Sequence, residues 1–405
     1  MEAVKVKSPE KKPWIRRRHK VITSVGMKLF APYMRLKFGI RPEKFTQQGD
    51  RAYLVLFNHQ TSFDQFFVAD SIKGPVYYMA TEDIFSLGWV SDIIRWAVAP
   101  IPIRKQTTDP RAVMNCIRVA REGGTIALAP EGNRTYHGRT VHINPAIGAM
   151  AKKLKLPIAL YRIEGGYGVQ PRWSDGTRRG KMRAYVSQVI EPEEYANWTA
   201  QELCEKIRQG LWVDEAVVNG EFHHKKLARY LERAVYVCPK CGLSEWESHN
   251  DTICCKKCGM QVRYLPTREL EGVGETFPFR FVADWYDYQR SYVNQLNTGD
   301  YLDQPMYRDE ARVSEVIVYK RKELLHKKAQ IALYGDRVTV NGTVLAFDDI
   351  YGVAVLGRNK LNIYHNDRIY QFKGDKRFNA LKYVNIYYRS RNITRGEENE
   401  QFLGL

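Results

Sequence analysis

The sequence lacks any apolar stretch long enough to cross a membrane as a helix. Such a helix needs about 18 or more consecutive apolar residues, and no segment of these 405 residues reaches that length. Near the N-terminus, Lys28 interrupts the segment that most resembles the apolar centre of a signal peptide. The sequence therefore predicts a chain that does not span the bilayer.

Acidic residues are scarce relative to basic ones. The chain has 63 Lys and Arg against 45 Asp and Glu, a formal net charge of +18. Half of this excess lies within residues 1–40, where eleven basic residues face two glutamates. A basic block of this kind indicates an anionic partner, either a membrane surface or a nucleic acid.

The pattern of this basic segment favours the membrane. At about 100° per residue the apolar and basic residues lie on opposite faces, as in helices of the lipid headgroup layer. The apolar face holds Ile15, Ile22, Val25, Leu29, Tyr33 and Leu36, and the basic face holds Arg16, Arg17, Lys20, Lys28 and Arg35. Pro32 is expected to kink this helix or to start a second one. The alternative is a surface helix packed on its own domain.

Short apolar stretches alternate with helical patterns in the next part of the chain. The expected strands are residues 53–57, 76–79, 99–103, 125–129 and 157–163. Alternation of this kind predicts an α/β sheet covered by helices. Functional side chains are then expected where the strands end.

A histidine and an aspartate stand five positions apart after the first expected strand. His59 follows the end of this strand. Asp64 lies in the first turn of the next helix, whose dipole keeps a carboxylate ionised. Asp64 can hold the proton of one imidazole nitrogen and leave the other nitrogen as a base. No Ser or Cys lies in a recognisable nucleophile elbow, so direct transfer to a hydroxyl is simpler than a covalent enzyme intermediate.

Four short blocks follow one another between residues 58 and 159. They are Asn58 to Asp64, Ile101 to Arg104, Pro130 to Thr135 and Leu156 to Ala159. In content and order they resemble the four blocks of the glycerolipid and lysophospholipid acyltransferases, namely N-H-x4-D, a strand ending in arginine, P-E-G-T-R-S and a proline-containing block. The resemblance covers roughly residues 15–225.

The resemblance implies the roles of individual residues. His59 would deprotonate the hydroxyl of a lysolipid, and Asp64 would orient it. An arginine fork suits a phosphate, and a glycine lets backbone amides approach it. The residues that would bind the phosphate of the acceptor are Arg104, Glu131, Gly132 and Arg134.

The implied reaction moves a fatty acyl group from acyl-CoA or acyl carrier protein to the free hydroxyl of a lysophospholipid. The expected acceptor is 1-acylglycerol-3-phosphate, in phospholipid biosynthesis at the cytoplasmic face of a membrane, with the chain bound peripherally. Ala129 replaces a bulky Phe of the family pattern and Asn133 replaces a Thr, which leaves the acceptor open. Aromatic residues after these motifs are candidates for an acyl tunnel or for ordinary core: Phe63, Phe66, Phe67, Trp89 and Trp96.

Five of the seven cysteines lie in residues 238–258. Two C-x2-C pairs in this segment have the spacing of a zinc ribbon, formed by Cys238, Cys241, Cys255 and Cys258. Cys254 competes with Cys255, but only Cys255 keeps the spacing to Cys258. Four thiolates leave no open position on the metal, so a structural zinc in a reducing cytosol is predicted, with disulfides as the alternative. Neighbouring acidic residues offset the charge of the ribbon, which disfavours nucleic acid as its partner.

Turn and strand signals return near the C-terminus. Asn341-Gly342 between two apolar stretches predicts a type I′ hairpin. Further strands are expected at 353–356, 360–364 and 368–372, and a helix at 376–388. Antiparallel strands followed by one helix resemble the pleckstrin-homology-like superfold, whose members differ in function.

The predicted fold class is an α/β acyltransferase-type mixed sheet covered by helices, followed by smaller modules. These are a basic membrane-associating segment (1–40), the acyltransferase domain (41–230), the zinc ribbon (236–263), a helical connector (264–327), the antiparallel β domain with one closing helix (328–392) and a tail (393–405). The rival interpretation is a non-catalytic adaptor that uses the ribbon and the β domain at a membrane or on nucleic acid.

Overall fold

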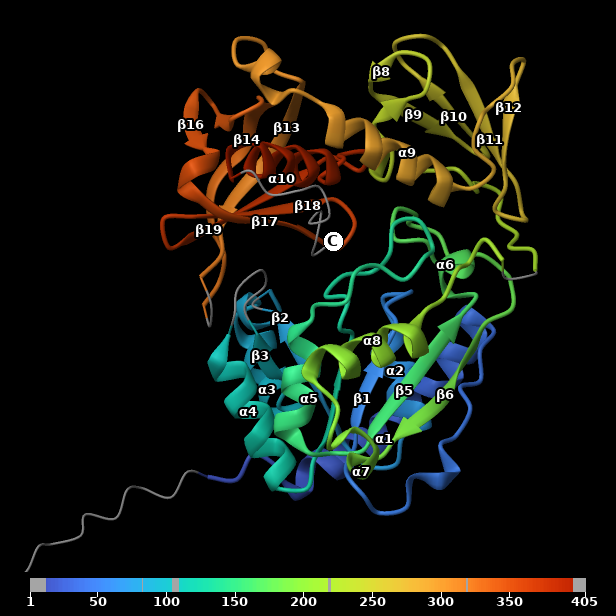
Figure 1. The fold of residues 1–405 in the computed structure, drawn as a ribbon, viewed down its shortest axis with the longest axis vertical. Coiled ribbons are helices and arrows are strands. Elements are labelled where there is room, and N and C mark those ends of the chain that lie inside the picture. The colour runs from blue at the N-terminus through green and yellow to red at the C-terminus, as the bar shows by residue number, and fades with distance from the viewer. Residues whose placement is uncertain (1–11, 82, 104–108, 218–219, 318–319, 396–405) are drawn as a thin grey trace, which may run out of the picture.

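The computed structural model describes residues 12–81, 83–103, 109–217, 220–317 and 320–395. Figure 1 shows two halves: a mixed α/β sheet with its helices below, and the ribbon and the C-terminal β domain above. The predicted fold class is confirmed: an α/β sheet comes first, then small antiparallel sheets with a four-cysteine cluster, and then an antiparallel sheet with a final helix.

The first sheet has the strand order β3-β2-β4-β1-β5-β6. Its strands are β1 (Leu54–Phe57), β2 (Val76–Thr81), β3 (Ile101–Ile103), β4 (Thr125–Leu128), β5 (Ile158–Glu164) and β6 (Arg183–Ile190). The first five are parallel, and β6 pairs antiparallel with β5. The sequence predicts the first five strands to within two residues at each end but misses β6, a half-exposed edge strand with a mixed pattern.

Helices cover both faces of this sheet. They are α1 (Arg17–Phe38), α2 (Asp64–Ser71), α3 (Trp89–Val98), α4 (Pro110–Arg121), α5 (Ala146–Leu154), α6 (Gly166–Val169), α7 (Pro192–Tyr195) and α8 (Ala200–Leu211). In the central strand β1, Leu54 and Leu56 join the core under α4, α5 and α8, whereas Val55 and Phe57 join the core under α1 and α2. A strand buried on both faces explains the uninterrupted apolar stretch in the sequence.

Helix α1 turns its predicted apolar face outward. It buries Ala31, Met34 and Phe38 instead, while Leu29 is 76% and Leu36 is 89% exposed. The helix continues through Pro32, so of the two predicted alternatives, a kink or the start of a second helix, the second is wrong. No helix within the described residues is long and apolar enough to cross a membrane.

The ribbon and its neighbours follow the first domain. The strands are β7 (Val237–Cys238), β8 (Gly242–Leu243), β9 (Trp246–His249), β10 (Thr252–Cys255), β11 (Gln261–Tyr264) and β12 (Leu270–Val273). β9 to β12 form an antiparallel sheet, and β7 pairs with β8. Helix α9 (Val282–Gln295) then packs its Trp285 against Trp246 of the ribbon, with the ring centroids 4.8 Å apart.

The C-terminal sheet has the order β16-β15-β14-β13-β19-β18-β17 and is antiparallel throughout. Its elements are β13 (Tyr307–Glu315), β14 (Glu323–Leu333), β15 (Arg337–Val340), β16 (Thr343–Ala346), β17 (Ile350–Leu356), β18 (Lys360–His365), β19 (Arg368–Gly374) and α10 (Leu381–Arg395). The hairpin at Asn341 and Gly342 is confirmed, and both residues have positive φ. The helical connector is corrected, because β13 and the start of β14 lie in residues predicted to be helical.

The two halves share one hydrophobic core. Tyr136, from the loop after β4, and Trp173, from the segment after β5, belong to the same buried cluster as the ribbon and the C-terminal sheet. Arg139 adds ion pairs across the junction, with Nη2 3.1 Å from Asp284 and Nη1 2.6 Å from Asp287 of α9. The upper half therefore packs on the loops at the carboxyl ends of the parallel strands (Figure 1), where the motif residues lie.

Candidate active site and metal centre

His59 and Asp64 form a hydrogen-bonded pair at the end of β1. The imidazole Nδ1 lies 2.7 Å from Asp64 Oδ2, and Asp64 is fully buried. The same carboxylate accepts hydrogen bonds from the backbone amides of Gln60 and Thr61 and from the Thr61 hydroxyl, at 2.6 to 3.0 Å. A carboxylate that accepts this many hydrogen bonds is held rigidly. It therefore fixes the proton of His59 on Nδ1.

The other imidazole nitrogen, Nε2, is left as a base. Among the residues that the structure describes, none makes a hydrogen bond to Nε2, and the side chain of His59 is 25% exposed. Burial lowers the pKa of His59 below its ordinary value of 6.5; Asp64 opposes this, whereas the positive charges of Arg134 and Arg172 add to it. The imidazole is therefore neutral at physiological pH, as a general base must be.

Glu131 holds the backbone around His59. One carboxylate oxygen accepts from the His59 amide at 2.7 Å, and the other accepts from the Val141 amide at 2.8 Å. Burial raises the pKa of Glu131 to about 8. Both oxygens of Glu131 are thus engaged with backbone amides, and a contact of Glu131 with an acceptor phosphate stays a prediction.

Arg134 provides a cation beside this pair. Its Nη2 is buried and has no hydrogen-bond partner within the described residues, and Nη1 reaches only Gln170 Oε1 at 3.5 Å. Burial lowers the pKa of Arg134 to about 9, and the nearby charges of Arg172 and Arg358 contribute to this shift. A buried guanidinium nitrogen without a partner is a site for an anion, because an anion would supply the missing hydrogen bond and offset the like charges.

Gly132 and Arg104 are the remaining motif residues. Gly132 has φ of 68°, a left-handed conformation that favours glycine, and it forms the exposed turn between Glu131 and Arg134. Arg104 lies outside the described residues. β3, which ends just before Arg104, is the edge strand and is separated from β1 by β2 and β4.

The aromatic candidates for an acyl tunnel fall into two groups. Phe63 and Phe66 pack beside Phe30 of α1, and Phe67 is fully buried in the core under α1 and α2. Trp89 and Trp96 instead lie on the surface of α3 with exposed fractions of 63% and 57%. The tunnel interpretation is therefore wrong for the two tryptophans, which α3 turns outward.

Two residues near the base were missed in the sequence. Gln170 Oε1 accepts from the amide and hydroxyl of Ser62, and Arg172 Nη1 donates to the carbonyl oxygen of Arg134 at 2.8 Å. Both follow β5 and lie more than a hundred positions after His59 in the sequence. No local motif marks them, because only the pairing of β5 with β1 brings this segment to the site.

Four cysteine sulfurs converge at the base of the ribbon. The Sγ atoms of Cys238, Cys241, Cys255 and Cys258 all lie within 4.8 Å of one another. Two of the pairs, Cys238 with Cys258 and Cys241 with Cys255, are 3.6 Å apart, close to the roughly 3.8 Å expected for tetrahedral thiolates around zinc. The Cys254 sulfur points to the carbonyl groups of Cys255 and Gly259 instead. The cluster could thus bind a metal ion.

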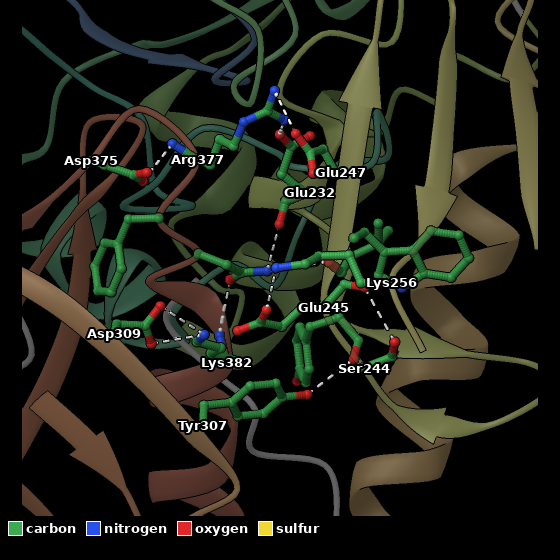
Figure 2. Close-up of a pocket in the computed structure, with 15 residues that line it drawn as sticks. Glu232, Ser244, Glu245, Glu247, Lys256, Tyr307, Asp309, Asp375, Arg377 and Lys382 are labelled. Carbon is green, nitrogen blue, oxygen red and sulfur yellow. Dashed lines mark hydrogen bonds and ion pairs between the residues drawn. The ribbon is translucent and has the colours of Figure 1, made fainter. Parts of the chain in front are cut away.

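A cavity of about 190 Å³ lies between the ribbon and the C-terminal domain. Figure 2 shows that its charged side chains pair with one another, for example Lys382 with Asp309 and Arg377 with Glu232. Most of the charges at this seam are thus paired within it, which indicates a structural joint between the two domains. The base at His59 lies elsewhere, at the end of β1.

Part of the first domain matches a family model. An α/β sheet that presents a His–Asp pair and an arginine with a buried, unpartnered nitrogen at its carboxyl edge is suited to acyl transfer. Residues 40–163 match the model of the family described as Acyltransferase.

Individual relatives are distant. The 1-acyl-sn-glycerol-3-phosphate acyltransferase of Bacillus subtilis (strain 168) is 18% identical over 136 residues, which cover 34% of this chain and 65% of that protein. The chloroplastic 1-acyl-sn-glycerol-3-phosphate acyltransferase BAT2 of Brassica napus is 23% identical over 168 residues, 40% of this chain and 45% of the relative. The matches thus leave a third or more of each curated relative uncovered. The crystal structure of the 1-acyl-sn-glycerophosphate (LPA) acyltransferase PlsC from Thermotoga maritima aligns with a TM-score of 0.40 and 19% identity, over 49% of this chain and 82% of that one.

Proposed function

We propose that this protein transfers a fatty acyl group from acyl-CoA or acyl carrier protein to the free hydroxyl of 1-acylglycerol-3-phosphate. The observation that carries the proposal is the arrangement of one base and one cation. His59 keeps a free Nε2 while Asp64 holds Nδ1, and the nearby Arg134 keeps a buried Nη2 without a partner. The base suits a hydroxyl and the guanidinium suits a phosphate.

The proposed reaction is a direct displacement. Nε2 of His59 takes the proton of the acceptor hydroxyl as its oxygen attacks the thioester carbonyl carbon. The new carbon–oxygen bond forms, the carbon–sulfur bond breaks, and the proton is passed to the leaving thiolate. Asp64 stabilises the imidazolium that exists between the two proton transfers.

A turnover assay tests this proposal. Purified protein is incubated with labelled 1-acylglycerol-3-phosphate and either acyl-CoA or acyl carrier protein, and the diacyl product and the free thiol are measured in parallel. Equal amounts of both products support acyl transfer, and thiol release without diacyl product indicates hydrolysis. The absence of turnover with a panel of lysolipids would favour the adaptor interpretation.

The pH dependence of the rate should follow His59. Because its pKa lies below 6.5, the acid limb of the kcat/KM profile should fall at a lower pH than for a free imidazole. Replacing Asp64 by Asn removes the group that raises this pKa, so the limb should move to still lower pH while the rate decreases. The phosphomonoester substrate titrates near pH 6 with either enzyme. The difference in pH between the acid limbs of the two profiles therefore reports the pKa of His59. A limb that moves to higher pH in Asp64→Asn would contradict this assignment.

We also propose that α1 and α3 place the site at an anionic membrane surface, on its cytoplasmic face. The two helices pack together, and Arg18 of α1 lies over the ring of Trp96 at 5.3 Å. Both helices expose apolar side chains, including Leu29 and Leu36 of α1 and Trp89 and Trp96 of α3. Exposed tryptophans beside basic residues are typical of surfaces that lie in the headgroup layer.

Replacing Trp89 and Trp96 together by Ser should weaken binding to anionic vesicles by about tenfold for each side chain, since each would lose the free energy of burying an apolar ring. Cosedimentation with phosphatidylglycerol-containing vesicles measures the effect. Trp212, which is 45% exposed and follows α8, gives the matched control. Equal loss of binding in Trp212→Ser would show that the effect does not belong to α3.

The four cysteines are proposed to hold a structural zinc ion. Four thiolates complete a tetrahedral shell and leave no position for a substrate. In this proposal the metal stabilises the ribbon, and the residues of the first domain carry out the chemistry. The C-terminal sheet with its closing helix is proposed to be pleckstrin-homology-like.

A further inference from the structure

The turn between β17 and β18 reaches from the C-terminal domain to the proposed phosphate pocket. Arg172 of the first domain donates from Nε to the carbonyl oxygen of Gly357 at 3.0 Å and from Nη2 to that of Val355 at 3.2 Å. The same guanidinium donates from Nη1 to the carbonyl oxygen of Arg134 at 2.8 Å. The backbones of residues 134 and 357 therefore lie on either side of one buried side chain.

Arg172 is a link between domains and is poorly placed to be a ligand. It is 2% exposed, it lies over the ring of Tyr136 at 4.3 Å, and its Nη2 also reaches Asn133 Oδ1 at 3.3 Å. Each nitrogen of its guanidinium thus already donates to a protein oxygen atom. Asn133 is one of the two positions at which the third motif departs from the family pattern, so this departure coincides with the contact to the C-terminal turn.

Arg358 follows Gly357 and is held much more loosely. Its side chain is 33% exposed, and its ion pair with Asp175 spans 3.2 Å. Asp175 is already paired with Arg233 at 2.7 Å. Two guanidinium groups therefore share one carboxylate, and Arg358 keeps donors that an incoming anion can use.

A second contact holds the C-terminal domain in this position. Asp83, which follows β2, forms ion pairs with Lys322 just before β14 and with Lys360 at the start of β18. The turn that contains Arg358 is therefore held at two points of the first domain. Asp83, after β2, pairs with Lys360, and Arg172, after β5, donates to the carbonyl oxygen of Gly357.

On the basis of the proposed function, we propose that Arg358 binds the acceptor phosphate together with Arg134 and thereby selects phosphomonoesters over phosphodiesters. A phosphomonoester carries about −1.5 to −2 charges at neutral pH, whereas a phosphodiester carries one. Arg358 would add a second guanidinium fork and a second positive charge to those of Arg134. Only the monoester has enough charge to use both. The C-terminal domain would then determine which lysolipid the first domain accepts.

The kinetic test compares two acceptors in wild type, Arg358→Gln and Arg358→Lys. For lysophosphatidate the Gln variant should raise KM by about 10- to 100-fold, as for the loss of a hydrogen bond to a charged group, with kcat within about threefold. For lysophosphatidylglycerol, KM should change little. The Lys variant keeps the charge without the fork and should lie between. Equal changes with both acceptors, or none with either, would overturn the proposal.

A binding measurement separates this proposal from the proposed function. Titration calorimetry with 1-acyl-2-deoxyglycerol 3-phosphate, which lacks the reacting hydroxyl, reports the phosphate pocket without chemistry. Binding to wild type that is weakened in Arg358→Gln supports the role of Arg358 even if no acyl donor gives turnover. Turnover in wild type with equal binding by both proteins retains the acyltransferase and removes Arg358 from its pocket. Arg368→Ala, at a 62% exposed site on β19, is the control and should behave as wild type.

Discussion

Replacing His59 by Ala is expected to lower kcat/KM by about 10³-fold, within the range that general-base catalysis contributes. The variant loses Nε2, the atom proposed to take the proton of the acceptor hydroxyl, and it keeps the surrounding backbone. Glu131 binds the amide of residue 59, which alanine retains. The melting temperature should therefore stay close to that of the wild type, and steady-state release of free thiol measures the loss of rate.

A second histidine gives the matched control. His223 lies 2.9 Å from Glu221 on the surface, with both side chains 60% exposed. His223→Ala removes the same side chain from a His–carboxylate pair outside the site and should leave the rate unchanged. Retention of full activity in His59→Ala, with product formation confirmed, would exclude His59 as the base.

Asp64 should act with His59 as one unit. Asp64→Asn is expected to lose activity as well, because an amide cannot accept from all the donors that meet the carboxylate of Asp64. The double variant should then be little slower than His59→Ala alone, as is found for residues that work together. Multiplicative effects of the two substitutions would indicate separate roles.

Local patterns in the sequence were sufficient where local physics decides the structure. The parallel strands β1 to β5 are buried, so their apolar stretches are unbroken and easy to find. The hairpin at Asn341-Gly342 needs two residues with positive φ, which this pair adopts readily. His59 and Asp64 are only five positions apart, and a helix begins at Asp64, so local structure is enough to bring the two side chains together.

Non-local pairing explains the errors. The first half of β14 is exposed and rich in Glu, Leu and Lys, which are good helix formers, and only its register with β13 makes it a strand. The motif around Glu131 does not predict the amides that its carboxylate meets, which are those of His59 and Val141. Arg172 reaches the site only after β5 pairs with β1 and the C-terminal domain docks.

Of the substitutions proposed here, loss of a ligand from the four-cysteine cluster should lower the stability of the protein most. Structural zinc sites contribute about 10 to 16 kcal/mol of binding free energy in zinc-finger peptides, so Cys255→Ser is expected to lose the metal and unfold the ribbon. Cys238, Cys255 and Trp246 belong to the same core as Trp285 and the C-terminal sheet. The loss should therefore spread beyond the ribbon and lower the melting temperature of the upper half by on the order of 10 °C. Metal analysis and calorimetry of the purified protein measure both effects.

Cys254 makes this prediction specific to one sulfur atom. It adjoins Cys255 in the sequence, but its sulfur points away from the cluster, toward the carbonyl groups of Cys255 and Gly259. Cys254→Ser should keep about one zinc per chain and the melting temperature of the wild type. If Cys254→Ser lost the metal while Cys255→Ser retained it, the ligand assignment would be wrong. Loss of stability without any zinc in the wild type would instead identify the thiols as ordinary core residues.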